Sequence, residues 1–190
     1  MKTFELQGLK RDSLGTKEAK SLRKEGKVPC VLYGGKENIH FYVNEINLQK
    51  LIYTPEVYLV ILKIDGEEHK AIIKELQFHP VTDRIIHIDF QEIFEDKPFV
   101  VELPIKVTGS SIGVKAGGKL QIKQRKLKVK GLLKDMPDYL EIDITNLNVG
   151  QSFKVGNLKF NNLQLIDHPD LMVVKIASTR AAKEAAEAQK

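Results

Sequence analysis

The sequence predicts a mainly β protein in two parts, the first with short helices among its strands and the second all β. Short runs of alternating apolar and polar residues recur along the chain, and turn signals rich in Gly, Pro, Asn and Asp separate them. The 190 residues, 42% of them hydrophobic, suffice for one or two compact domains. A single cysteine, Cys30, cannot form an internal disulfide, so packing must supply the stability and a reducing, cytosolic setting fits best.

The first part, residues 1–94, begins with a predicted helix and strand. Thr16 is a plausible N-cap, and Gly26 is a typical stop for a helix that leaves several lysines and arginines outside. A strand is expected at Val28–Tyr33, followed by a second strand and a helix that Asn44 caps and that ends before Pro55.

Three further strands and a turn complete the first part. Residues 57–80 read as a hairpin joined at Asp65 and Gly66, which is a strong turn signal. The segment "IIHIDFQEIF", residues 85–94, reads as another strand.

The second part, residues 95–176, follows an acidic patch and a proline at 96–98. Apolar residues alternate over 101–107, 120–129 and 140–144, with a phase slip near 124–126 that implies a bulge or turn. Regular short strands favour a sandwich or barrel, in which residues 115–134 form a basic hairpin. The stretch "GVKAGG", residues 113–118, is expected to be a turn with positive φ. Residues 177–190 are an Ala/Glu/Lys-rich tail, helical or disordered.

Positive charge is concentrated in two blocks. Residues 1–36 hold nine Lys and Arg against four acids, which is the whole net charge of +5, and residues 115–134 hold eight with no acid. Such blocks indicate a polyanion, with nucleic acid ahead of membrane because no amphipathic apolar face accompanies them. The alternative is that these charges only face solvent. For the second block, the lysines could also protect an edge strand from aggregation.

Motifs for catalysis are lacking, so the sequence predicts no enzyme, no cofactor and no small-molecule substrate. There is no P-loop, no G-x-S-x-G and no H-E-x-x-H. No apolar run approaches the roughly 20 residues that cross a bilayer, and the N-terminus lacks the apolar core of a signal peptide.

One polar segment, "QFHPVTDRIIHIDF", has residues that could carry chemistry. His79, Asp83, His87 and Asp89 could be metal ligands, but nothing supplies a second matched set, and we predict no metal. His87 and Asp89 stand two apart on one strand face. They could form a structural hydrogen bond, or they could read RNA through base edges or the 2′-OH.

These segments together resemble one family. "KRDSLGTKEAKSLRKEGKVPCVLYGG" and "QFHPVTDRIIHIDF" are similar in order and spacing to the bacterial large-subunit ribosomal protein twenty-five family, which binds 5S ribosomal RNA. That similarity covers residues 1 to about 93, and the remainder resembles the second domain of the longer members, the general stress protein Ctc type. The resemblance implies a six-stranded antiparallel β-barrel with short helices, a C-terminal all-β domain, and one barrel face bound to a non-standard helical region of 5S ribosomal RNA.

The resemblance also implies the binding residues. RNA contacts carry over to Arg11, to Arg23 or Lys24, to Tyr33, and to the pair His87 and Asp89. With the neighbouring basic residues and the histidine of the second motif, the predicted RNA-binding set is Lys10, Arg11, Lys17, Lys20, Arg23, Lys24, Tyr33, His79, His87 and Asp89. Without the resemblance, Tyr33 would be interpreted as a cap on the barrel core.

Two functions from different classes follow. The first is a structural protein of the large ribosomal subunit, located on the cytoplasmic ribosome, that binds 5S ribosomal RNA and contacts other ribosomal proteins through its C-terminal domain. The alternative is a stress-related β-barrel module that binds a protein partner through that domain. RNA binding requires the basic excess on one face beside Tyr33 and His87, whereas a protein partner does not.

Overall fold

The structure, a computed structural model, describes residues 1–179 and divides into two compact units. Unit 1 comprises residues 1–101 with 132–134, and unit 2 comprises residues 102–131 with the chain from 135. The division falls inside one strand, a few residues after the predicted boundary at 96–98. The predicted tail beyond residue 179 lies outside the described part of the chain.

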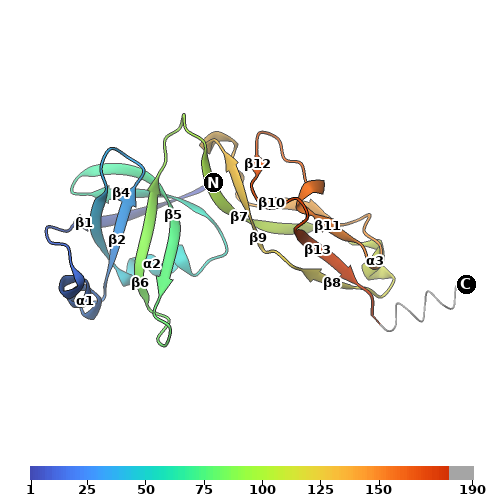
Figure 1. The fold of residues 1–190 in the computed structure, drawn as a ribbon, viewed down its shortest axis with the longest axis horizontal. Helices are drawn as coiled ribbons and strands as arrows, with labels where there is room; N and C mark the ends of the chain where they lie inside the picture. Colours follow the sequence, from blue (N-terminus) through green and yellow to red (C-terminus); the bar gives the residue numbers. More distant parts are fainter. Residues whose placement is uncertain (180–190) are drawn as a thin grey trace, which may run out of the picture. The chain divides into compact units, whose positions relative to one another are not determined.

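Unit 1 is a closed barrel of six strands with two short helices (Figure 1). Its elements are β1 (Lys2–Lys10), α1 (Thr16–Lys24), β2 (Lys27–Tyr33), β3 (Ile39–Asn44), α2 (Glu45–Ile52), β4 (Tyr58–Ile64), β5 (Glu67–Phe78) and β6 (Ile85–Glu92). The order around the barrel is β1-β3-β2-β6-β5-β4. The predicted mainly β fold with a six-stranded barrel is confirmed.

The pairing inside the barrel is mixed, and not antiparallel throughout as the resemblance implied. Four neighbouring pairs are antiparallel, and two, β1 with β4 and β2 with β6, are parallel. The predicted hairpin is β4–β5, where Asp65 at φ 49° and Gly66 at φ 93° adopt the two positive φ values of a type I′ turn. Strand β1 was not predicted, although it pairs with β4 along most of its length.

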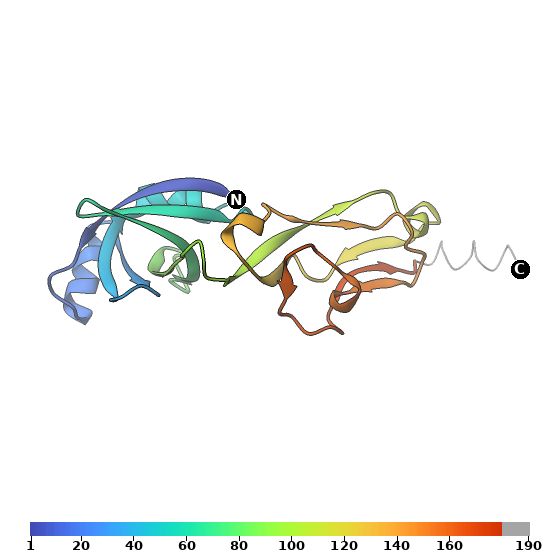
Figure 2. The same cartoon turned by 90° about the horizontal axis from the view of Figure 1, so that it is seen from above.

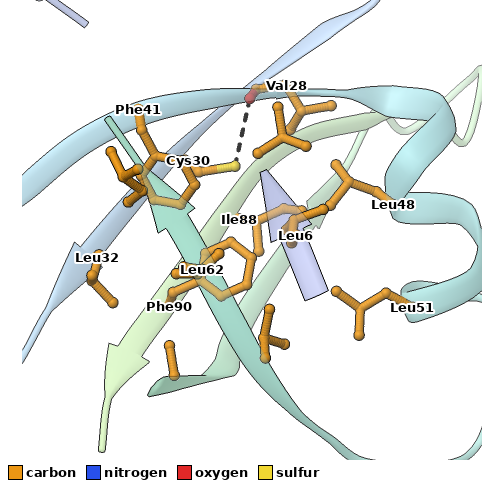
Figure 3. Close-up of a cluster of buried hydrophobic side chains, with 14 of the residues drawn as sticks. Leu6, Val28, Cys30, Leu32, Phe41, Leu48, Leu51, Leu62, Ile88 and Phe90 are labelled. Carbon is orange, nitrogen blue, oxygen red and sulfur yellow. Dashed lines mark hydrogen bonds between the residues drawn. The ribbon is translucent and has the colours of Figure 1, made fainter. Parts of the chain in front are cut away.

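The barrel core fills the space between these strands. Phe41 of β3 and Phe90 of β6 are fully buried with their ring centroids 5.7 Å apart, and leucines and isoleucines from the other strands surround them (Figure 3). Leu48 and Leu51 of α2 belong to the same core, so α2 is held by its apolar face. The sulfur of Cys30 lies in this core, 3.5 Å from the carbonyl oxygen of Val28 (Figure 3).

The two helices of unit 1 differ in how well their N-termini match the prediction. The N-cap position of α1 is Gly15, and Thr16 is the first helical residue, so the predicted Thr16 cap is wrong. Asn44 does stand at the N-cap position of α2, but its side chain makes no capping hydrogen bond.

Unit 2 contains two open sheets. Its elements are β7 (Phe99–Thr108), α3 (Ile112–Lys115), β8 (Lys119–Ile122), β9 (Lys126–Gly131), a 3-10 turn (Leu133–Asp135), β10 (Leu140–Asp143), β11 (Ser152–Lys154), a second 3-10 turn (Val155–Asn157), β12 (Gln164–Leu165) and β13 (Met172–Ala177). One sheet has the order β10-β7-β9-β12 and the other β11-β13-β8. Strand β13, drawn in red, runs beside β8 in both views (Figure 1 and Figure 2).

The predicted basic hairpin at residues 115–134 is therefore wrong. Strand β8 pairs with β13, whereas β9 pairs with β12 in the other sheet. The phase slip near residues 124–126 marks the point where the chain passes from one sheet to the other. The glycine-rich stretch before it forms α3 and then a turn at Gly117, whose φ of 85° fits the predicted left-handed backbone.

Candidate nucleic-acid interface

Three adjacent strands present a polar outer face on unit 1. In β2, Cys30 and Leu32 are buried while Val31 and Tyr33 point outward. The register places Val31 opposite Asp89 of β6, and the next strand, β5, places Glu75 and Gln77 opposite Asp89 and His87. We call this surface, made of Tyr33, Glu75, Gln77, His87 and Asp89, the strand face.

His87 and Asp89 form a close pair on the strand face. The Nδ1 atom of His87 lies 2.8 Å from Oδ1 of Asp89, and each side chain is a little over a quarter exposed. A carboxylate accepts but does not donate, so Nδ1 carries the proton in this pair and Nε2 remains to face a ligand. Among residues 1–179 no group of three or more His, Cys, Asp or Glu side chains could hold a metal ion.

Tyr33 stands at the end of β2, beside the pair. Burial raises the pKa of its hydroxyl, and the negative charges of Asp89 and Glu75 raise it further. The hydroxyl therefore stays protonated and can donate a hydrogen bond. Tyr33 is half-buried and is not one of the buried residues of the barrel core.

Helix α1 contributes exposed cations next to this surface. Lys17, Lys20 and Lys24 are exposed, while the buried Leu22 holds the helix against the barrel. Arg23 is half-buried, and its Nε donates to the carbonyl oxygen of Ile86 at 2.9 Å. That bond fixes α1 to β6 directly before His87, so the basic helix and the strand face adjoin.

The end of β1 and the residue that follows it are two predicted residues with different surroundings. Lys10 ends β1 and is exposed. The side chain of Arg11 is only 7% exposed, and its Nη2 lies 3.7 Å from Oε2 of Glu18. Arg11 is therefore not a surface cation like its neighbours.

His79 has a structural environment of its own. It begins the turn between β5 and β6, where its Nδ1 accepts the backbone N–H groups of Val81 and Thr82, both at 3.3 Å. Its backbone also bonds to Arg84 and Asp83 across the turn. The ring thus stabilises the turn, and His79 is not part of the strand face.

Sequence reasoning missed some members of the site. Glu75 and Gln77 join the strand face only through the β5–β6 register, which contains two irregularities that no local pattern indicates. His40 of β3 lies opposite Val31 and extends the same outer surface. Glu18, the ion-pair partner of Arg11, was also not among the predicted site residues.

Comparisons with known proteins agree with the fold. Residues 6–90 match the Ribosomal L25p family, and residues 98–180 match the family described as ribosomal protein TL5, C-terminal domain. Proteins described as large ribosomal subunit protein bL25 are similar over nearly the whole chain. The protein of Azobacteroides pseudotrichonymphae is 50% identical over 96% of this chain and 97% of its own, and that of Porphyromonas gingivalis is 50% identical over 98% of both. The protein of Bacteroides thetaiotaomicron is 45% identical over 99% of this chain and 98% of its own.

These matches and the fold define a ribosomal protein built from a β-barrel and a second all-β domain. The chain belongs to the Ribosomal L25p family, in the form that carries a TL5-type C-terminal domain. The resemblance inferred from the two N-terminal motifs is confirmed. No helix within residues 1–179 is long and apolar enough to cross a membrane.

Proposed function

We propose that this chain is a structural component of the large ribosomal subunit and binds 5S ribosomal RNA through the strand face and helix α1 of unit 1. The membership in the Ribosomal L25p family and the relatives described as large-subunit proteins support the ribosomal role. The observation that carries the RNA site is the placement of Tyr33, His87 and Asp89 on one outer surface beside a basic helix.

The two parts of the site have different tasks in this proposal. The exposed lysines of α1 suit phosphates, because the attraction between a lysine and a phosphate does not depend on the base sequence. Their long side chains can also move to reach the RNA backbone. The strand face contains the carboxylates of Glu75 and Asp89, which repel phosphates and instead accept from base amino groups or 2′-hydroxyls. Tyr33 adds a donor hydroxyl and an aromatic ring that can stack on a base.

A filter-binding assay with the full chain tests the function. We expect tight binding to 5S ribosomal RNA and much weaker binding to a control RNA of the same length, measured at the same salt concentration because salt governs non-specific affinity. Equal affinity for both RNAs would mean that the protein binds polyanions in general and has no site specific for 5S ribosomal RNA. No binding to either would refute the proposal.

A further inference from the structure

Arg11 is a buried cation whose hydrogen bonds are incomplete. Its side chain is 7% exposed, and its Nε is buried with no hydrogen-bond partner among the described residues. The nearest carboxylate oxygen, Oε2 of Glu18, lies 3.7 Å from Nη2, which is an ion-pair distance but too long for a hydrogen bond. Nε and Nη2 form the side edge of a guanidinium, the edge that grips a planar carboxylate or a phosphate with two parallel bonds.

Glu18 lies in the first turn of α1, where an anion is stabilised. The N-cap residue Gly15 supplies no side-chain cap, so the first backbone N–H groups of α1 receive no help from it. The hydroxyl of Ser13 donates to Oε2 of Glu18, the same oxygen that faces Arg11. One carboxylate thus lies among a buried guanidinium, a hydroxyl donor and a helix N-terminus.

We infer that this is a phosphate site, and that Glu18 occupies it as an internal anion until an RNA phosphate displaces its carboxylate. The inference rests on the proposed RNA-binding function and deepens it. A phosphate in that position can accept from both Nε and Nη2, whereas Glu18 makes neither bond. Arg11 thereby gains the partners that it lacks in the free protein.

Burial determines which partner moves. The Glu18 side chain is 31% exposed, so it can rotate into water and recover its hydration. Arg11 cannot leave at comparable cost, because its charge lies beneath the surface. Glu18 therefore shields the buried charge in the free protein and competes with RNA for it.

Comparison of Glu18→Gln with Asp12→Asn tests the inference. Both changes remove one negative charge from the same segment, but Asp12 is exposed and has no ion pair with Arg11 among the described contacts. We expect Glu18→Gln to tighten binding of the full chain to 5S ribosomal RNA by about two- to five-fold more than Asp12→Asn, the range expected for loss of one partly exposed ion pair. In an Arg11→Gln background the two changes should have equal effects.

Three results would overturn the inference while leaving the proposed function intact. They are equal effects of the two changes in the wild-type background, an advantage of Glu18→Gln that persists without Arg11, and an Arg11 Nε–H NMR resonance that 5S ribosomal RNA does not shift. The NMR measurement uses the wild-type chain and decides the question if Arg11→Gln fails to fold. A wild-type chain that does not bind 5S ribosomal RNA would instead refute the proposed function, and this inference with it.

Discussion

Asp89 holds the ring of His87 from two residues away on the same strand, at 2.8 Å, and both groups face outward. We predict that Asp89→Ala weakens binding to 5S ribosomal RNA by about 1–3 kcal/mol, because it leaves the ring and an RNA donor without an acceptor. Since it removes no phosphate contact, the slope of log K against log salt should not change. Filter binding across a salt series measures both quantities.

Lys24→Gln is the variant to compare with Asp89→Ala. Lys24 is exposed on α1, and losing one phosphate contact should flatten the salt slope by roughly 0.7–0.9. If Asp89→Ala binds as well as wild type and only lowers the melting temperature, the pair is a structural hydrogen bond of the barrel and the site assignment fails.

Cys30 is expected to be chemically inert in the folded protein. Burial is the main cause that raises the pKa of its thiol, the charge of Asp89 adds to the effect, and Arg11 opposes it. The folded thiol therefore stays protonated through pH 9, where an unfolded thiol with a pKa near 8.5 is mostly thiolate. Alkylation by iodoacetamide should be far slower in buffer than in guanidinium chloride at pH 7, and raising the pH to 9 should widen the difference. Similar rates in both solutions would mean that the barrel opens readily.

The site residues differ in how far the sequence could predict them. The spacing of His87 and Asp89 on a strand fixes a common face, so their pairing was predictable. The burial of Arg11 was not, because it depends on where Glu18 lies after α1 has packed against the barrel. A run of basic residues shows the charge of each member but not which of them lies beneath the surface.

Strand β1 shows why one element of the barrel was missed. Its sequence, "KTFELQGLK", buries only Leu6 and Gly8, so its apolar alternation is weak. The strand is defined instead by its neighbours, β4 and β3, which are distant in the sequence. The wrong hairpin at residues 115–134 has a related cause, since alternation is the same whether two successive strands pair with each other or join different sheets.

Gly8 makes β1 sensitive to a single methyl group. A Cβ atom there would lie 2.6 Å from a ring carbon of Phe41, which is fully buried in the core. We predict that Gly8→Ala destabilises the barrel by about 1–3 kcal/mol through overpacking, measured by urea denaturation. Gly15→Ala is the control, because no atom lies within 4 Å of a Cβ at that position and its φ of 162° is extended. Equal stability of the two variants would mean that Phe41 can shift without cost.

The whole molecule combines a barrel with a separate all-β unit, and the barrel is predicted to fold alone. Every residue of the core cluster around Phe41 and Phe90 lies between positions 4 and 90. A fragment of residues 1–94 should therefore give a cooperative melt and keep the affinity of the full chain for 5S ribosomal RNA. A folded fragment that does not bind would show that unit 2 contributes to the site, and an unfolded one would place the domain boundary later, within β7.

The two-part organisation was predictable because the composition changes at residues 96–98 and the strands after it are short and regular. Closure of the barrel, by contrast, was implied only by the resemblance to a family. Local patterns define strands, but the parallel pairs that close the barrel join segments separated by several other elements.

The parallel pairing of β2 with β6 also has a consequence for the order of synthesis. Tyr33 emerges from a translating ribosome long before His87 and Asp89, with β3, α2, β4 and β5 between them. The strand face cannot exist on a nascent chain until β6 has emerged. We therefore expect chains stalled before residue 85 to show only the weak, salt-sensitive attraction of α1 for RNA, and chains released beyond residue 94 to discriminate 5S ribosomal RNA from other RNAs. Discrimination by the shorter chains would mean that recognition needs only the first half of the barrel.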